Sequence, residues 1–380
     1  MNHRKESLEI NENSRILTYS QRKLRMHAAW ACFYEFQDLI GEIDDVDQFV
    51  PSQNYDVSKQ IFSWVKKFSR SCALGDAVRP KPNSVYLERD YDLFYILLEG
   101  PGECFVIDSI RNWRERSKFA ICHILEIWEK DIPRWEPLLK HFYKNFDHIF
   151  VGHYHGLDKI SQITGCPCSY LPVTVDALKF CPEPVDQPRP IDVLSLGRNS
   201  NLTHKVMYEF AEREGLWYIY DTLKNFEIKD YREHRALVSN QIKRSRYFFA
   251  HQSRANQPEV RGNQSEFGYR FFEGAAAGAV MIGDYPDTDV YRRYFNWPDA
   301  TIKTPFDDPN IEELIRELDS QPKRISKIRE NNVVNMLLRY DHALTWEKVL
   351  ATAGLTPTKK LLDRKKNLEH TASLIKAGSS

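Results

Sequence analysis

Small, charged and aromatic residues are combined between Ser265 and Asp284, where the chain reads SEFGYRFFEGAAAGAVMIGD. Gly268 opens a run of helix-forming residues, Gly278 closes it, and Ala279–Ile282 then reads as a short buried strand. A helix that starts at a glycine presents unpaired N–H groups and the positive end of its dipole, which suits phosphate oxygens. The segment therefore predicts a loop, helix and strand that bind the diphosphate of a nucleotide.

Arg270, Glu273 and Ala277 are spaced i, i+3 and i+7, so they share one face of the predicted helix. An ionised carboxylate only accepts hydrogen bonds and can hold the two hydroxyls of a ribose. The alternative is an ordinary Arg270–Glu273 surface pair, which would contribute about 0.2–0.5 kcal/mol to stability. Spacing alone does not decide between these interpretations.

Two cations follow the expected strand Ile191–Gly197. Arg198 comes directly after it, and Lys205 follows seven residues later, near the start of the next helix. Open α/β sheets bind ligands at the carboxyl ends of their strands, where an arginine and a lysine would stabilise a diphosphate leaving group. The alternative for Lys205 is an exposed cation on a helix surface.

Neighbouring strand ends supply further candidates for donor binding. Asp221 closes one strand and is expected near the nucleotide base. His251 and Arg254 begin the loop that reaches Gln264, which is long for an α/β connection and therefore typical of a functional loop. Loop arginines without a ligand are also common, so that alternative stays open for Arg254.

Two histidines and two cysteines could supply the four ligands of a tetrahedral zinc site: His153, His155, Cys166 and Cys168. Each pair is separated by a single residue, whereas structural zinc sites use wider spacing. We therefore expect no metal site.

Strand-like runs alternate with amphipathic segments, which predicts parallel, doubly wound sheets. In the first half, the expected strands are Arg15–Tyr19, Tyr91–Leu98, Phe119–Ile127, His148–His153 and Ser169–Val175, and the expected helices are Asp56–Cys72, Glu103–Arg116 and Pro133–Phe146. In the second half, further strands are expected at Leu216–Tyr220, Arg246–His251 and Ala300–Lys303, and helices at Leu202–Glu214, Tyr231–Ser245, Ile311–Leu318, Lys323–Leu338 and Leu344–Ala353.

The chain is long enough, at 380 residues, for two domains with separate cores. Four prolines within nine residues, between Pro182 and Pro190, favour an extended linker. The predicted organisation is a polar tail at 1–14, a first domain at 15–182, a linker at 183–190, a second domain at 191–340, and a C-terminal helix with a basic tail at 341–380.

Composition excludes several classes of protein. The chain is 42% hydrophobic, 28% charged and 13% aromatic, as in a globular protein. Lys plus Arg and Asp plus Glu both number 53, so no global positive field would attract nucleic acid. The start lacks the apolar core of a signal peptide, and the seven cysteines suit reduced thiols. A cytoplasmic location is therefore predicted.

The tail after Thr356 is locally basic, with six Lys or Arg residues against Asp363 and Glu369. One interpretation is a solvated or frayed helix. The other is a weak peripheral contact with an anionic membrane.

The segment Ser265–Asp284 resembles the signature of the group 1 glycosyltransferases of GT-B fold, in which Glu-x7-Glu precedes Ala-x-Ala-x-Gly and an apolar strand. Glu273 matches the second glutamate, whereas Ser265 stands in register with the first and Glu266 follows it. The Arg-Phe-Phe-Glu version at Arg270–Glu273 is similar to the spore-maturation-protein-like branch. The Gly-Arg strand end with its following lysine, and the segment Leu171–Pro182, are also similar to that family.

The resemblance implies an α/β fold of GT-B type: two doubly wound, Rossmann-like domains facing across a cleft, with C-terminal helices crossing back. It implies a hexosyltransferase-like enzyme that moves a sugar from a nucleotide-diphosphate-sugar, UDP- or GDP-sugar, to a glycan, lipid-linked or protein acceptor, with retention and without metal or cofactor. Arg198 and Lys205 would be catalytic, together with Glu126 at the cleft side of the first domain. Donor binding would fall to Gly268, Arg270, Glu273, Ser265, Glu266, Asp221, His251 and Arg254.

Two alternatives share the donor site. A nucleotide-sugar epimerase of GT-B fold would need no acceptor. A catalytically idle nucleotide-sugar-binding or scaffold protein would bind the donor without turnover, and the serine in place of the first glutamate motivates this reading.

Overall fold

The computed structural model describes residues 7–9, 13–51, 53, 55–81, 84–221 and 227–378. The chain divides into two compact units, and each gathers three separate segments. The first unit comprises Met1–Met26, Ile40–Pro172 and Glu347–Thr358, and the second comprises His27–Leu39, Val173–Trp346 and Lys359–Ser380. This division differs from the predicted ranges most clearly at His27–Leu39, which groups with the second unit. Most of the predicted tail at 1–14 lies outside the described residues.

The first unit is built on a seven-stranded sheet of order β1-β3-β2-β4-β5-β6-β7. β1 is antiparallel to β3, and the other pairs are parallel. The strands are β1 (Ser7–Glu9), β2 (Ile16–Tyr19), β3 (Val46–Val50), β4 (Tyr91–Leu98), β5 (Ser117–Ile124), β6 (His148–Val151) and β7 (Cys168–Tyr170). The central strand β4 is an almost continuous apolar run, as expected for a parallel strand covered on both faces.

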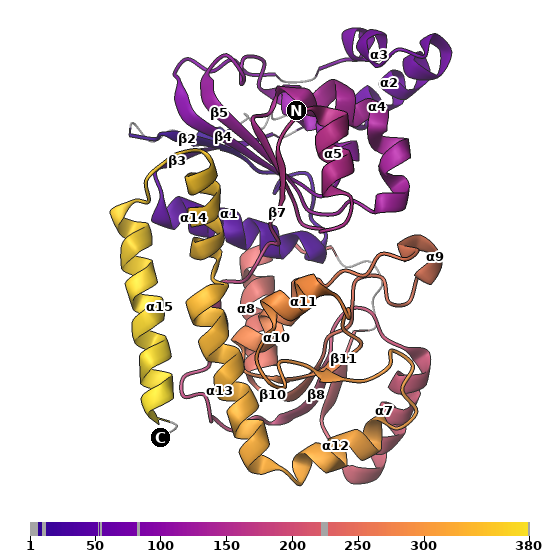
Figure 1. Cartoon of the computed structure of the whole chain (residues 1–380), viewed down its shortest axis with the longest axis vertical. Coiled ribbons are helices and arrows are strands. Elements are labelled where there is room, and N and C mark those ends of the chain that lie inside the picture. Colours follow the sequence, from indigo (N-terminus) through magenta and orange to yellow (C-terminus); the bar gives the residue numbers. More distant parts are fainter. Residues whose placement is uncertain are drawn as a thin grey trace. The chain divides into compact units, whose positions relative to one another are not determined.

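Helices flank this sheet, and Figure 1 shows α4 and α5 beside it. They are α2 (Asp56–Ser69), α3 (Cys72–Val78), α4 (Ile132–Phe142) and α5 (Leu157–Thr164), while α1 (Ala31–Ile43) and α14 (His342–Thr352) have residues in both units. The predicted helix at Glu103–Arg116 is wrong: the chain forms 3-10 turns over Pro101–Ser109. Because Cys104–Ile107 are consecutive and all buried, the segment is enclosed on every side and lacks a helical stripe.

The second unit has a five-stranded parallel sheet of order β12-β11-β10-β8-β9. Its strands are β8 (Ile191–Ser195), β9 (Tyr218–Tyr220), β10 (Ser245–Phe249), β11 (Val280–Gly283) and β12 (Ile302–Lys303). Its helices include α6 (Ala177–Phe180), α7 (Asn201–Glu214), α8 (Tyr231–Lys243), α9 (Pro258–Arg261), α10 (Arg270–Ala276), α11 (Asp289–Tyr294), α12 (Ile311–Asp319) and α13 (Pro322–Arg339). The strand–helix alternation predicted for both halves is therefore confirmed, and the protein has an α/β fold with two largely parallel sheets.

The basic tail forms a helix, α15 (Lys359–Gly378), which packs against α13 within the second unit. Its inward face carries Leu361, Leu368, Thr371 and Ala372. Among the described residues, no helix combines the length and apolar character needed to cross a bilayer.

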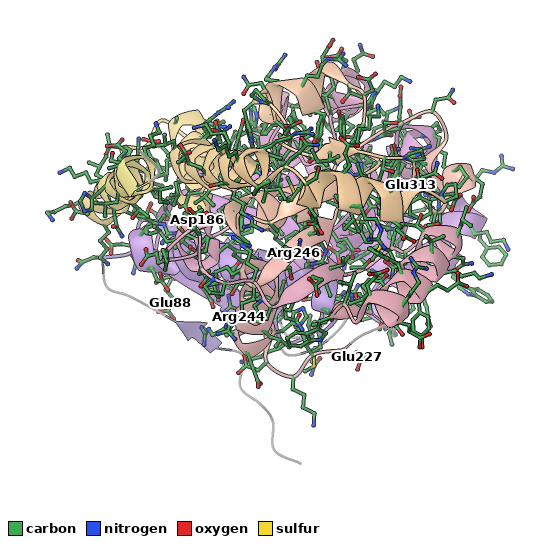
Figure 2. All side chains as sticks on the ribbon, turned by 90° about the horizontal axis from the view of Figure 1, so that it is seen from below. Glu88, Asp186, Glu227, Arg244, Arg246 and Glu313 are labelled. Atoms are coloured by element: carbon green, nitrogen blue, oxygen red, sulfur yellow. The ribbon has the colours of Figure 1, made fainter. Side chains whose placement is uncertain are left out.

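Charged side chains of both signs lie over the surface, with exposed Glu88, Asp186 and Glu313 among them (Figure 2). This agrees with the balanced charge of the sequence. All seven cysteines are free thiols.

Candidate functional site

The second sheet has a topological switch between β8 and β10. The chain passes from β8 outward to its neighbour β9, then returns to form β10 on the other side of β8. Connections therefore leave the carboxyl ends of β8 and β10 in opposite directions, which is where open α/β sheets bind ligands. The segments that follow these two strands begin at Leu196 and Ala250.

The loop after β8 is shaped by a carboxylate from the neighbouring strand end. Gly197 has a φ of +93° and donates its backbone N–H to Asp221 Oδ2 at 2.6 Å. Ser195 Oγ donates to Asn199 Oδ1 across the same turn. Arg198 is exposed at the tip of this loop, so it is accessible to an anion from solvent. Asp221 thus holds the loop that carries Arg198.

The loop after β10 contains a partly buried histidine held in one tautomer. His251 Nδ1 accepts a hydrogen bond from the backbone N–H of Asp284 at 3.1 Å, so its proton resides on Nε2 in the neutral ring. Burial lowers the pKa of His251 to about 4, although Asp284 and Asp307 oppose this shift. The ring is therefore neutral at neutral pH and offers a hydrogen-bond donor rather than a charge. Arg254, three residues later, is partly buried and has a φ of 55°.

The segment before α10 lies against this loop. The carbonyl of Glu266 accepts the Ser253 N–H at 2.7 Å, and Gln264 Nε2 donates to Glu266 Oε1 at 2.8 Å. Glu266 is buried, whereas Ser265 and Gly268 are partly exposed. A Cβ on Gly268 would lie 3.5 Å from Ser253 Oγ, which is an ordinary contact. The predicted donor-binding segments are thus brought together.

Glu273 is fully buried within α10, a helix of only seven residues. Its Oε1 accepts from Arg235 Nη1, and its Oε2 accepts from Arg270 Nη1 at 3.0 Å. Since both oxygens are engaged by arginines, a ribose contact would need one of these ion pairs to be replaced. The ion pair between Arg270 and Glu273, which the alternative interpretation placed on the surface, is present. Its Glu273 carboxylate is buried, and its Arg270 side chain is partly exposed.

Arg235 and Glu35 were not singled out in the sequence. Arg235 on α8 donates from Nε and Nη2 to Glu35 Oε2, at 3.1 and 2.8 Å. The side chains of Glu35, Arg235 and Glu273 are each at most 4% exposed. Burial alone would raise the pKa of Glu35, but Arg235 and His342 outweigh it and hold that pKa well below its usual range. The sequence did contain a sign that Arg235 is buried, because it shares a helical face with the apolar residues Val238 and Ile242.

Arg270 and Lys179, which lies 2.9 Å from Glu35, are partly exposed members of this cluster, and Arg270 is the one on α10. Its side chain is 26% exposed, and its guanidinium lies 5.4 Å from the centre of the Tyr269 ring. Burial would lower the pKa of Arg270, but Glu273 and Asp221 contribute to raising it. The cluster therefore presents one firmly charged, oriented guanidinium toward the carboxyl ends of the strands.

Residues 224–351 match a glycosyl transferase-like family. The glycosyl transferase-like segment spans α8 through most of α14 and so contains Arg235, Arg270 and Glu273. No curated protein matches the chain.

Comparison with solved structures shows similarity over most of the chain. The Anabaena protein Alr3699/HepE, whose crystal structure is in complex with UDP and glucose, has a TM-score of 0.54 at 12% identity, covering 90% of this chain and all of that one. The Glycosylation Associate Protein (Gap123) complex from Streptococcus agalactiae has a TM-score of 0.37 at 10% identity, covering 74% of this chain and 55% of that one, and supports no inference. The first similarity shows the fold: two parallel-stranded α/β units as in a GT-B glycosyltransferase, as the sequence predicted.

Lys205 lies outside the glycosyl transferase-like segment and faces solvent on α7. Its Nζ is 3.9 Å from Glu209 Oε1, and its side chain is 74% exposed. An exposed i, i+4 pair of this kind contributes little to stability. The helix-surface alternative describes its position, and a catalytic role stays a prediction.

Glu126 lies just beyond the carboxyl end of β5 in the first unit, where its Oε1 accepts from Trp128 Nε1. His123, within β5, is fully buried: its Nε2 donates to the Leu171 carbonyl at 2.8 Å and its Nδ1 accepts from the Tyr95 hydroxyl at 2.8 Å. Of the two residues, Glu126 is the partly exposed one. Its catalytic role stays a prediction.

We expect His123 to make the fold acid-sensitive. Burial lowers its pKa from 6.5 to about 4, so the unfolded chain takes up a proton below pH 6.5 that the fold refuses until about pH 4. Stability should therefore fall in this window, by up to about 1.4 kcal/mol per pH unit for one proton. Melting temperatures measured from pH 7 to 4 should show a shallower slope in His123→Gln than in the wild type, and an unchanged slope in the exposed control His370→Gln. Equal slopes for wild type and His123→Gln would contradict the assignment.

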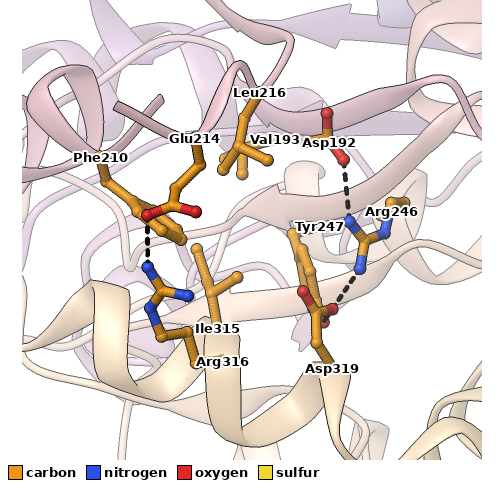
Figure 3. A pocket seen from close by; sticks show the side chains of 10 residues that line it. All are labelled: Asp192, Val193, Phe210, Glu214, Leu216, Arg246, Tyr247, Ile315, Arg316 and Asp319. Carbon is orange, nitrogen blue, oxygen red and sulfur yellow. Dashed lines mark hydrogen bonds and ion pairs between the residues drawn. The ribbon is translucent and has the colours of Figure 1, made fainter. Parts of the chain in front are cut away.

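A cavity of about 190 Å³ lies at the other end of the second sheet, near the amino ends of β8 and β10 (Figure 3). Its charged residues are already paired: Arg246 with Asp192 at 2.8 Å and with Asp319, and Arg316 with Glu214 at 2.7 Å. It is therefore distinct from the predicted donor site.

In the described part of the chain, no cluster of three or more His, Cys, Asp or Glu residues could hold a metal.

Proposed function

We propose that this protein is a glycosyltransferase, of the spore-maturation-protein-like branch, that takes its sugar from a nucleotide-diphosphate-sugar. The observation that carries the proposal is the match of residues 224–351 to a glycosyl transferase-like family, because this segment contains α10 and its arginine cluster. The UDP and glucose bound by the Anabaena protein of similar fold favour a UDP-sugar over a GDP-sugar.

The chemistry assigned to the site is stabilisation of a leaving diphosphate. As the bond from C1 of the sugar to the diphosphate breaks, positive charge develops on the ring and negative charge on the departing oxygen. Arg270, oriented by Glu273, and Arg198, exposed after β8, would stabilise that negative charge without metal or cofactor. His251 would donate a neutral hydrogen bond from Nε2. We further propose a hexosyl donor, retention at C1, and a glycan, lipid-linked or protein acceptor.

Nucleotide binding tests the donor site. A thermal-shift panel of UDP, GDP, ADP and dTDP should give a clear rise in melting temperature with UDP, because a ligand at 100 times its Kd stabilises the native state by about 2.7 kcal/mol. Arg270→Met and Arg198→Met should each weaken this nucleotide's affinity by about tenfold or more, as a lost charged hydrogen bond predicts. Arg292→Met, which removes an exposed pair on α11, is the matched control and should bind like the wild type.

The outcomes separate the alternatives. No shift with any of the four nucleotides would reject the donor site. Release of free nucleotide only when an acceptor mixture is present supports transfer, whereas a changed donor sugar without acceptor would indicate an epimerase. Binding without either reaction would indicate an idle nucleotide-sugar-binding protein. The anomeric configuration of the product, read by NMR, tests retention.

A further inference from the structure

An exposed apolar stripe runs along α2 in the first unit. It consists of Val57, Ile61, Trp64 and Phe68, which are spaced i, i+4, i+7 and i+11 and so lie along one side of the helix. Val57, Trp64 and Phe68 are 60%, 69% and 75% exposed. The rings of Trp64 and Phe68 lie 5.8 Å apart, which makes them one aromatic surface.

This stripe is not the core-facing side of α2. Another side of the helix buries Ser58 and Phe62, and the Phe62 ring lies 5.0 Å from Phe105 and 5.9 Å from Phe142 in the core of the first unit. The packing of α2 onto its own unit is therefore complete without the stripe. An aromatic pair left in water beside a satisfied core face indicates a surface with a further partner.

The charges on the rest of α2 indicate what kind of partner the stripe has. The segment Asp56–Arg70 carries four cations, Lys59, Lys66, Lys67 and Arg70, against one carboxylate, although the whole chain is neutral. Within the described residues, none of these four cations forms an ion pair with a carboxylate. Elsewhere on the surface such pairs are frequent, as in Lys140–Glu136 and Arg316–Glu214.

We propose that α2 is a docking helix for an anionic lipid surface. Trp64 and Phe68 would enter the boundary between headgroups and acyl chains, while Lys67 next to the stripe and the cations of the opposite, polar side, Lys66 and Arg70, attract the anionic headgroups, since an interfacial helix combines an apolar and a basic side. The contact is peripheral, and it involves a different element from the basic C-terminal helix. It does not depend on the proposed donor site, because no residue of the second unit takes part.

Vesicle co-sedimentation tests the proposal with the whole chain. Wild-type protein should bind vesicles that contain phosphatidylglycerol, bind pure phosphatidylcholine vesicles much less, and dissociate at high salt, where the Debye length falls from about 10 Å to about 3 Å. Trp64→Ser combined with Phe68→Ser should lower the partition coefficient by at least about tenfold. Lys66→Glu combined with Lys67→Glu should lower it by about 25-fold. Trp217→Ser, which removes a 54% exposed tryptophan in the second unit, is the matched control and should bind like the wild type.

A second readout is independent of the amount bound. Trp64→Phe keeps the apolar stripe, so it should still sediment with anionic vesicles while losing the blue shift of tryptophan emission that binding gives in the wild type. Failure of the wild type to bind anionic vesicles at low salt would overturn the proposal, as would wild-type binding by Trp64→Ser/Phe68→Ser. A third outcome is that the wild type does not bind vesicles and elutes from gel filtration as an oligomer, whereas Trp64→Ser/Phe68→Ser elutes as a monomer. The stripe would then be a protein interface, and the lipid assignment would be rejected.

Discussion

Replacing Arg235 with methionine is expected to destabilise the protein by about 3 kcal/mol, because Glu35 and Glu273 would lose the buried cation that they share and keep Lys179 and Arg270, respectively, as ion-pair partners. Arg235 bonds both Glu35 and Glu273, and all three side chains are at most 4% exposed. Its guanidinium also lies 4.9 Å from the centre of the Phe180 ring, so the substitution removes a packed cation as well. Denaturant unfolding followed by circular dichroism measures the effect.

A second substitution separates two contributions to this loss of stability, the lost ion pairs of the buried carboxylates and the lost packing of the arginine side chain. Adding Glu35→Gln to Arg235→Met removes one of the two carboxylates that lost their shared cation, so the double variant should recover part of the lost stability. Arg232→Met is the matched control on the same helix: its partner is Asp38 at 2.8 Å, but the arginine side chain is 69% exposed, and the cost should stay below about 1 kcal/mol. A loss below about 1 kcal/mol for Arg235→Met itself would show that the network contributes little.

Gly283→Ala should be nearly as disruptive, at about 3 kcal/mol or more. A Cβ at Gly283 would lie 1.9 Å from the Ala250 carbonyl oxygen and 2.7 Å from the Ala250 carbonyl carbon, and these are backbone atoms that no rotamer change can move. The clash lies between the carboxyl ends of β10 and β11. Moving these strand ends apart to relieve it would displace His251 and Asp284. The variant should therefore lose nucleotide binding as well as stability.

Gly41→Ala is the control for Gly283→Ala, because it adds the same methyl group at a position with no neighbouring atoms. Nothing lies within 4 Å of a Cβ there, and the residue sits inside α1, so alanine should stabilise by about 0.5–1 kcal/mol. Thermal melts of the two variants side by side should move in opposite directions. A neutral Gly283→Ala would mean that β10 and β11 can separate at this point.

Local patterns were sufficient for most of the strands and helices. β4 and the helices α7, α8 and α12 lie within a residue or two of their predicted bounds, because each is a periodic or continuous apolar run bounded by clear breaks. The strand β3 and the helix α1 were not singled out. β3 contains the consecutive polar residues Asp47 and Gln48, which break the apolar pattern, and buried Asp47 accepts a hydrogen bond from the Tyr91 hydroxyl of β4, a contact that only the folded sheet reveals.

The site was predictable in outline but not in its pairing of charges. Glycines and strand ends placed Gly197, Arg198, His251 and Arg270 on one edge of the sheet, because parallel strands align their carboxyl ends. The partners of Glu273 could not be deduced in the same way. Arg235 precedes it by 38 residues and Glu35 precedes Arg235 by 200, and spacing along one helix carries no information on contacts of that range.

The membership of His27–Leu39 in the second unit has a consequence for the order of events during synthesis. Glu35 leaves the ribosome about 200 residues ahead of Arg235, and the stretch between them includes most of the first unit. We therefore expect this part of α1 to lack its native ion pair while the first sheet is translated, since Arg235 has not yet been made. Closure of so long a loop is expected to be a late step of folding, and residues 27–39 should stay accessible to chaperones at least until α8 is made.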